Sequence, residues 1–258
     1  MLSLVVVALA ARLPESPTFA AMQEVRRRRA AGDTAGAHAL AAEHDLEEAA
    51  HHHTGVKDVF TPELRRHTTC LALAWFFNWF GIQVFSVLGT TILVEAKAVS
   101  FDNALVILIL SNAVGFVGYV FHGWLGDKIT RKRTVVLGWL AGGVVSLVML
   151  LGPADSAFII PLYALTLFFL TGPYAALLFY MGESFPPQVR GMGANVAHVM
   201  APLGGIAGSG LLTILLTAGV DAGTAAIITG TGGLIASALC MAGTRTLHDA
   251  HRKTTVIA

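Results

Sequence analysis

Polar and aromatic side chains occur inside long apolar stretches of this sequence, where they are costly and therefore informative. A polar group in hydrocarbon needs a partner, so such residues commonly mark a path for a substrate or an ion. Trp75 and Trp79 lie one helical turn apart and could stack on a ring or on the face of a sugar. Ordinary packing or interfacial anchoring is the alternative for each residue. The candidates are Trp75, Asn78, Trp79, Gln83, Asn112, Tyr174, Asn195 and His198.

The same stretches lack the residue sets that catalysis needs. No Asp or Glu lies in the interior of any of them, so proton coupling would use His198 or an acid outside this chain. Ser209 is preceded at two positions by Ala207, where a serine-hydrolase turn has glycine. Paired carboxylates and His-Glu metal motifs are also missing from them. We therefore expect no enzyme activity, no cofactor and no metal, and no paired role for Cys70 and Cys240.

A short charged segment, Gly123 to Arg133, separates two apolar stretches that are each long enough to cross a bilayer. Its carboxylate, Asp127, and its cation, Arg131, could bridge neighbouring helices in one conformation and release them in another. The alternative is a basic stop that only fixes topology. A β-branched residue such as Thr130 would strain any left-handed turn at its position.

A second charged segment runs from Gly182 to Gly191. Pro186 and Pro187 end a helix and force a tight turn, which predicts that Glu183 and Arg190 lie at two helix ends, close enough to pair. Such a pair could latch two helices in one conformation. The alternative is two interfacial charges held in headgroup water.

Composition indicates which elements position these residues. The chain is 55% hydrophobic and 13% charged, and its mean hydropathy is +0.67, outside the usual soluble range. A spanning helix needs roughly 20 mainly apolar residues. Six stretches meet that need, namely Thr69 to Val94, Asn103 to Phe121, Val135 to Leu151, Ala157 to Met181, Met192 to Ala218, and Gly223 to Ala242. The sequence thus predicts an all-α integral membrane protein with a bundle of six transmembrane helices.

Basic residues predict the orientation of this bundle. Lys97 is the only one of the 17 Lys and Arg residues in a loop assigned to the outside. Both ends of the six-span unit are therefore expected in the cytoplasm, with the protein in the inner cell membrane. A basic inner rim beside anionic lipid explains this charge better than nucleic-acid binding, so no nucleic-acid partner is expected.

The residues before the bundle predict a cytoplasmic helical loop. Phe19, Met22 and Val25 share one helical face, and after a Gly-Asp break Thr34 to Ala50 continue as a second helical run. The histidines at 51–53 cannot share one helix face, which favours a solvated loop over a metal site.

Three motifs resemble the major facilitator superfamily, of the sugar porter or metabolite:proton symporter type. The segment at 123–133 resembles its signature loop, whose pattern is Gly, any, Leu, small, Asp, basic, any, Gly, Arg, basic. Residues 14–17 resemble the Pro-Glu-Ser-Pro motif that follows the sixth of twelve spans. The segment at 182–191 resembles the Glu, aromatic-Pro, Arg-Gly loop. The signature match comprises Gly123, Leu125, Gly126, Asp127, Lys128, Arg131 and Lys132, and it departs at Thr130, where the family usually has Gly.

The resemblance implies that the chain is the C-terminal six-span half of a twelve-span transporter. Residues 1–12 are then the remnant of a preceding span, 13–68 a cytoplasmic central loop, 69–244 the six-span bundle and 245–258 a cytoplasmic tail. The resemblance also implies a conformational gate, whose residues are Gly123, Asp127, Lys128, Arg131, Lys132, Glu183 and Arg190.

The expected function is secondary active transport of a small polar metabolite, a sugar or an organic acid, by alternating access. The expected partners are the lipid bilayer, the small molecule and the N-terminal six-span half, in the same or a separate chain. The site of such a transporter lies between two halves, so one half encloses only one wall. The alternative is a non-transporting membrane scaffold or a regulatory half-transporter.

Overall fold

The computed structural model describes residues 17–43, 55–186 and 189–246. Within these ranges all regular structure is helical. The chain divides into two compact units, residues 1–54 and 55–258, and each is described by itself. The predictions for residues 1–12, for the motif at 14–16, for the histidines at 51–53 and for the tail beyond 246 lie outside the described ranges.

The first unit is a helical hairpin. Helix α2 (Pro17–Ala30) and helix α3 (Thr34–Glu43) pack on each other, as the apolar pattern of this segment predicts. Gly32 lies between them with φ +83°, a conformation that glycine adopts without strain. The core of the hairpin is small and consists of Ala21, Val25, Ala37 and Ala41.

The second unit contains six helical stretches that are long and apolar enough to cross a membrane, which confirms the predicted number. A 3₁₀ turn at Val56–Phe60 precedes them. The six stretches are Arg65–Val87, Phe101–Ile129, Arg131–Leu151, Ser156–Ser184, Arg190–Thr217 and Ala222–Ala242.

Four of these stretches are interrupted or continued by a second helix. A break at Gly172-Pro173 separates α8 from α9. Five-residue π-helical turns interrupt the first and the last stretch, at Gln83–Val87 (η2) and Ile227–Thr231 (η3). The helices are α4 (Arg65–Ile82), α5 (Gly89–Lys97), α6 (Phe101–Ile129), α7 (Arg131–Leu151), α8 (Ser156–Thr171), α9 (Tyr174–Ser184), α10 (Arg190–His198), α11 (Met200–Thr217), α12 (Ala222–Ala226) and α13 (Gly232–Ala242).

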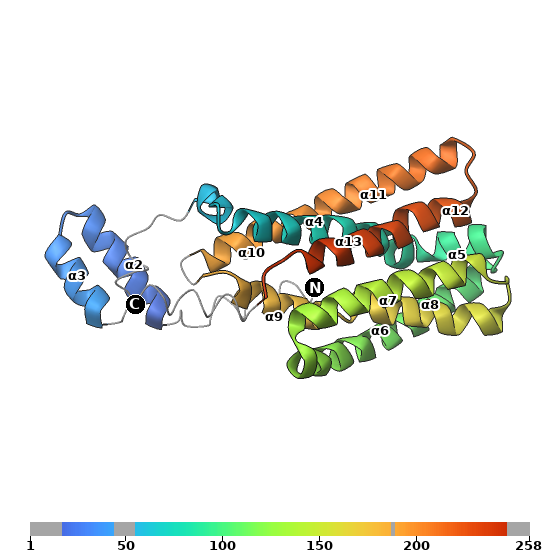
Figure 1. Cartoon of the computed structure of the whole chain (residues 1–258), viewed down its shortest axis with the longest axis horizontal. Helices are drawn as coiled ribbons and strands as arrows, with labels where there is room; N and C mark the ends of the chain where they lie inside the picture. Colours follow the sequence, from blue (N-terminus) through green and yellow to red (C-terminus); the bar gives the residue numbers. More distant parts are fainter. Residues whose placement is uncertain (1–16, 44–54, 187–188, 247–258) are drawn as a thin grey trace. The chain divides into compact units, whose positions relative to one another are not determined.

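The six spans form two groups of three (Figure 1). Helix α4 packs between α11 and α13, and α8 packs against α6 and α7. Helices α7 and α13 join the two groups. Aromatic side chains fill the centre, where Trp139, Tyr163 and Phe85 are fully buried.

Glycine sets the distance between helices at several close crossings. A Cβ on Gly204 of α11 would overlap the backbone carbonyl of Phe76 on α4, and one on Gly118 of α6 would lie 2.7 Å from the carbonyl oxygen of Phe168 on α8. Gly204 and Gly208, at small-xxx-small spacing in the fifth span, therefore let α11 approach α4 closely.

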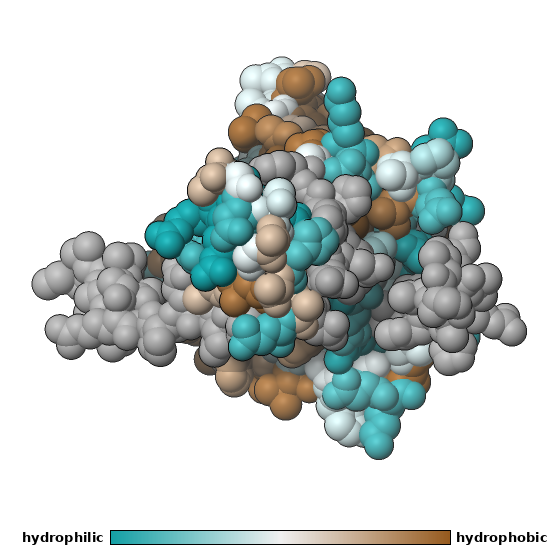
Figure 2. Space-filling view, turned by 90° about the vertical axis from the view of Figure 1, so that its left-hand side faces the viewer, coloured by the Kyte–Doolittle hydropathy of each residue, from teal (hydrophilic) through white to brown (hydrophobic). Residues whose placement is uncertain are grey.

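The bundle has two ends, which we name by a charged residue at each. The Asp127 end holds the ends of α6, α9 and α13 and the starts of α4, α7 and α10. The Lys97 end holds the ends of α5, α7 and α11 and the starts of α6, α8 and α12. Figure 2 is turned so that the left-hand side of Figure 1 faces the reader, and hydrophilic residues intermix there with hydrophobic ones.

The prediction of a loop from Gly123 to Arg133 is wrong, because nearly all of this segment is helical. Helix α6 continues to Ile129, beyond the predicted end of the span at Phe121, and α7 begins at Arg131, so Thr130 alone lies outside a helix. A helix satisfies its own backbone hydrogen bonds in any medium, so it can carry charged side chains out to headgroup water without unwinding.

Candidate functional site

The junction at Thr130 joins two helices through one strained residue. Thr130 has φ +102° and ψ 140°, in the region that favours glycine. Its hydroxyl oxygen accepts a hydrogen bond from the backbone N–H of Arg133 at 3.4 Å, and its carbonyl accepts one from the hydroxyl of Thr134 at 3.0 Å. The β-branched residue therefore caps α7 at the cost of backbone strain, on the order of 1 kcal/mol.

Arg131 is the centre of the charged cluster at the Asp127 end. Its guanidinium forms an ion pair with Glu183 of α9 and lies 3.8 Å from the carboxylate of Asp127 on α6. It also covers the ring of Phe179 at 4.9 Å. The Arg131 side chain is 22% exposed, against 72% for Asp127 and 45% for Glu183, so one half-buried cation connects three helices.

The predicted pair of Glu183 with Arg190 is wrong for this conformation. Glu183 lies in the last turn of α9 and contacts Arg131, whereas Arg190 begins α10, is exposed, and has no ion pair within the described residues. Glu183 is still within α9, which contacts the start of α7 there, and the chain leaves the helix only at Phe185.

The remaining predicted gate residues take three different positions. Gly123 is half-buried, and a Cβ there would lie 3.6 Å from that of Ala175. Lys128 is exposed. Lys132 donates from Nζ to the carbonyl oxygen of Thr244 at 2.5 Å. A pocket of about 690 Å³ opens beside this cluster, with Asp127 and Arg131 among its lining residues.

A polar and aromatic cluster lies between α4, α9 and α10, and its members are buried except for the exposed His198. Asn78 is fully buried, and its Oδ1 accepts from the hydroxyl of Tyr174 at 2.5 Å. The ring of Trp75 lies 5.2 Å from that of Tyr174 and 4.6 Å from that of His198, centroid to centroid. The Nδ2 of Asn78 has no hydrogen-bond partner within the described residues. The structure thus brings together four of the predicted path residues and leaves one buried donor unsatisfied.

A second group faces α11 from the last turn of α4 and the start of η2. Gln83 donates from Nε2 to the hydroxyl of Ser209 at 2.6 Å. The ring of Trp79 lies against Gly205, where a Cβ would be 3.1 Å away. The indole Nε1 of Trp79 is buried, and no partner for it occurs in the part of the chain that the structure describes.

Two predicted path residues lie apart from both groups. Asn112 is exposed on α6 and donates to the carbonyl of Leu108 in its own helix at 2.8 Å. Asn195 is exposed on α10. Neither joins the buried cluster around Asn78 in this conformation.

Sequence reasoning missed three contacts that hold the bundle. Lys97 is buried and donates to the carbonyls of Leu150 and Gly152, at 2.9 and 2.7 Å. The hydroxyl of Tyr163 donates to the carbonyl of Phe85 at 2.5 Å. Both contacts end on backbone oxygens, whose positions no residue pattern reveals. Burial lowers the pKa of Lys97 below its ordinary value.

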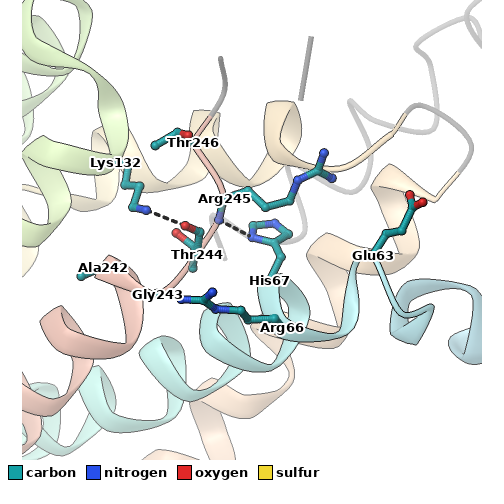
Figure 3. Close-up of a pocket in the computed structure, with 9 residues that line it drawn as sticks. All are labelled: Glu63, Arg66, His67, Lys132, Ala242, Gly243, Thr244, Arg245 and Thr246. Carbon is teal, nitrogen blue, oxygen red and sulfur yellow. Dashed lines mark hydrogen bonds between the residues drawn. The ribbon is translucent and has the colours of Figure 1, made fainter. Parts of the chain in front are cut away.

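The third missed contact involves the segment Gly243–Thr246, which follows α13 and is named here the C-terminal strap. His67 at the start of α4 is buried, and its Nδ1 accepts from the backbone N–H of Arg245 (Figure 3). His67 falls in the predicted cytoplasmic loop at 13–68. Its place between two arginines and the first apolar stretch indicates only an interfacial position.

These groups can bind and release, and no described group suits metal catalysis. Within the described ranges no cluster of three His, Cys, Asp or Glu side chains could hold a metal ion. The buried cluster offers ring faces and an amide donor, which suit a small ligand with a ring and a polar acceptor. The Arg131 cluster offers an ion pair that can exchange partners between helices.

The chain is similar in sequence to known transport proteins. The family profile described as sugar (and other) transporter matches residues 1–243. A niacin transporter from Acinetobacter baylyi is 27% identical over 168 residues, which are 63% of this chain and 36% of that protein. A gentisate transporter from Corynebacterium glutamicum is 26% identical over 207 residues, 77% of this chain and 44% of that protein.

A vertebrate protein is also similar. Organic anion transporter 3 from Oryctolagus cuniculus is 28% identical over 163 residues, which are 57% of this chain and 26% of that protein. In each of these three comparisons the matched part of the chain covers less than half of the relative's length.

Proposed function

Because the chain belongs to the sugar (and other) transporter family of the major facilitator superfamily, we propose that it forms one half of a secondary active transporter. Membership of this family makes the chain a membrane transport protein and not an enzyme. It moves a small polar metabolite by alternating access, together with a second six-span half. In this proposal the bundle lies in the inner cell membrane, with the Asp127 end toward the cytoplasm.

The distribution of buried surface supports the need for a second half. The spans Phe101–Ile129 and Arg190–Thr217 are each 28% buried over their most apolar window, against 44–56% for the other four. Large apolar residues such as Phe116 and Ile206, 71% and 72% exposed, face outward on these two spans. Lipid covers part of this surface, and the second half covers the face on which α10 carries Asn195 and His198.

The unsatisfied amide of Asn78 is the observation that carries the substrate proposal. A buried donor without a partner costs about 1–3 kcal/mol, which an acceptor group on a bound substrate would offset. Tyr174 bonds the other end of this amide, the ring of Trp75 lies against that of Tyr174, and the exposed ring of His198 meets Trp75 edge-on. The relatives named for niacin, gentisate and organic anions favour an organic acid with a ring over a sugar.

The Arg131 cluster is the proposed gate. Its ion pair with Glu183 joins α7 to α9, and Arg131 also approaches Asp127 on α6. In the other conformation Glu183 is released, and Arg190, exposed at the start of α10, is the cation that it then meets. Gly123 and Lys128 support this gate from α6.

Uptake tests the substrate proposal. The chain, reconstituted in proteoliposomes with the adjoining six-span half, is given radiolabelled gentisate, nicotinate or glucose under an imposed proton gradient. We expect uptake of an aromatic acid and not of glucose. Asn78→Ala should reduce that uptake about ten-fold, the equivalent of about 1.4 kcal/mol. The matched control is Asn103→Ala, at an exposed asparagine in the first turn of α6, and should leave uptake unchanged.

The gate is tested in the same proteoliposomes. Arg131→Gln should lower uptake about ten-fold, because the coupling between conformations is typically worth 1–3 kcal/mol. Arg65→Gln removes an exposed arginine at the same end of the bundle and should have no effect. Equal uptake by both variants would disprove the gate. An absence of uptake for all three probes, with the bundle correctly inserted, would favour the scaffold or regulatory alternative.

A further inference from the structure

The C-terminal strap is held by side chains from three helices. Lys132 of α7 donates to the carbonyl of Thr244 at 2.5 Å. The hydroxyl of Tyr180 on α9 is within hydrogen-bonding reach of the Thr244 hydroxyl, at 2.8 Å, and of the Arg245 carbonyl. His67 of α4 accepts from the Arg245 N–H at 3.3 Å. Figure 3 shows the His67 ring beside the strap, with the Arg66 and Arg245 side chains extending on either side of it.

The strap connects the same two helices as the proposed gate. Arg131 and Glu183 form the direct ion pair between α7 and α9. Their chain neighbours, Lys132 and Ser184, are connected through the strap, because Lys132 bonds Thr244 while Ser184 lies 3.0 Å from Nε2 of His67. Movement of α9 away from α7 therefore has to break both connections.

Hydrogen bonding fixes the protonation state of His67 in this conformation. A backbone N–H can only donate, so the Nδ1 that accepts from Arg245 carries no proton, and the proton of the neutral ring lies on Nε2, toward Ser184. An imidazolium donates from both nitrogens and cannot accept from an amide. Protonation of His67 is thus incompatible with the strap bond.

From this geometry we propose that His67 is a proton-binding site which, when neutral, holds the C-terminal strap and through it the Arg131–Glu183 gate, and which releases both on protonation. The link to transport rests on the proposed function; the link between proton and strap does not. His67 is a positioning residue, since it acts on the gate through the strap and Lys132.

Burial first, and then the nearby cations, oppose protonation of His67 while the strap is bound. Arg66 and Glu63 lie beside it at the start of the first span, Lys132 faces it from α7, and Arg245 faces it from the strap. Helix α9 and the turn after it contribute the uncharged rings of Tyr180 and Phe185, 6.0 and 4.6 Å away. Three cations against one carboxylate leave the bound state positive, so the proton enters when the strap leaves.

This arrangement gives the Asp127 end a defined proton step. His67 and the strap both line a pocket of about 390 Å³, and when the strap opens, Nδ1 is freed and the ring takes a proton there. Closing expels that proton again. No carboxylate inside a span is needed for this exchange.

Hydrogen exchange of the strap measures the proposal directly, because the Arg245 amide is the hydrogen-bond donor. The full chain in lipid nanodiscs is exchanged at about pH 7.5 and about pH 5, with correction for the chemical exchange rate. If the released ring titrates at about 6.5, protection of the strap should fall about 30-fold between these pH values.

Two substitutions separate titration from packing. His67→Asn keeps an oxygen acceptor near the Nδ1 position and cannot titrate, so strap protection should persist and lose its pH dependence. His67→Leu removes the acceptor, and protection should be low at both pH values. His38→Asn, in the hairpin unit, is the matched control and should exchange like the unsubstituted chain.

Two results would overturn the proposal. One is equal strap protection at both pH values in the unsubstituted chain. The other is the same fall in His67→Asn as in that chain. The measurement needs neither a substrate nor the second half, so a failure of uptake leaves it intact, and its own failure leaves the uptake experiments intact.

Discussion

The two ends of the bundle are joined in different ways. At the Asp127 end, the direct side-chain contacts between α6, α7 and α9 are the ion pairs of Arg131 with Glu183 and Asp127, among side chains that are 22–72% exposed. At the Lys97 end, a buried cation donates to the carbonyls of Leu150 and Gly152. Deeper in the same half of the bundle, Tyr163 donates to the carbonyl of Phe85.

The two kinds of contact differ in how easily they break. A salt bridge near water costs little to break and finds new partners easily, whereas a buried donor that leaves a backbone oxygen strands both groups. The Asp127 end is thus suited to change partners and the Lys97 end to hold its helices. Substitutions at the two ends should therefore affect stability and transport in opposite proportion.

The largest loss of stability is expected at the Lys97 end. Lys97→Met keeps the length of the side chain but strands two carbonyls, which should cost about 2 kcal/mol. The midpoint of thermal unfolding in detergent should fall by about 4–8 °C. Lys57→Met, at an exposed lysine in the 3₁₀ turn, should leave it unchanged. Equal midpoints for both variants would remove the contrast between the ends.

A smaller loss is expected where Tyr163 holds the π-helical turn. Tyr163→Phe removes the hydroxyl that donates to the Phe85 carbonyl, at a cost of about 1 kcal/mol. The same thermal measurement applies, with Tyr119→Phe as its control, because the Tyr119 ring lies at a partly exposed position on α6. A larger fall in the unfolding midpoint for Tyr119→Phe would show that the Tyr163 hydroxyl is not what stabilises this part of the bundle.

The Arg131 cluster should contribute little to stability. Arg131→Gln is expected to change the unfolding free energy by less than about 1 kcal/mol, since its partners are half-exposed, although the same substitution should lower uptake. Measuring the unfolding free energy and the uptake on one preparation gives the loss of stability relative to the loss of uptake. If Arg131→Gln destabilises the bundle as much as Lys97→Met does, this end also serves as a support.

The smallest effect should be a gain. Thr130→Gly relieves the positive φ at the junction of α6 and α7 and loses a weak cap, with a net stabilisation of about 0.5 kcal/mol. Thr130→Ala loses the cap and keeps the strain, so it should be destabilising. Thermal unfolding of the two variants side by side checks the sign, and a loss in both would show that the cap outweighs the strain.

The helices themselves could be predicted from sequence, because apolar length and glycine-proline breaks are local signals. The six spans, the break at Gly172-Pro173 and the two helices before residue 44 follow from such signals. The end of α6 could not be placed, because charged residues after Phe121 are compatible with both a helix and a loop.

Partners across the fold were harder to predict. The sequence places Glu183 near Arg190 along the chain, while the fold brings Arg131 from α7 to it. Trp75, Asn78, Tyr174 and His198 were selected for their types, and their meeting depends on how α4, α9 and α10 cross. His67 has no sequence signal at all, since its partner is a backbone amide from residue 245.

The π-helical turn at Gln83–Val87 bears on how this chain should be aligned with its relatives. Such a turn holds about one residue more than a regular turn, so a relative without it carries a one-residue deletion there. Successive residues of an α-helix are rotated by about 100° about its axis. Such a deletion would therefore turn α5 about its axis, so that other side chains face the bundle. A gap moved by a few positions would then pair outward-facing residues of one protein with inward-facing residues of another.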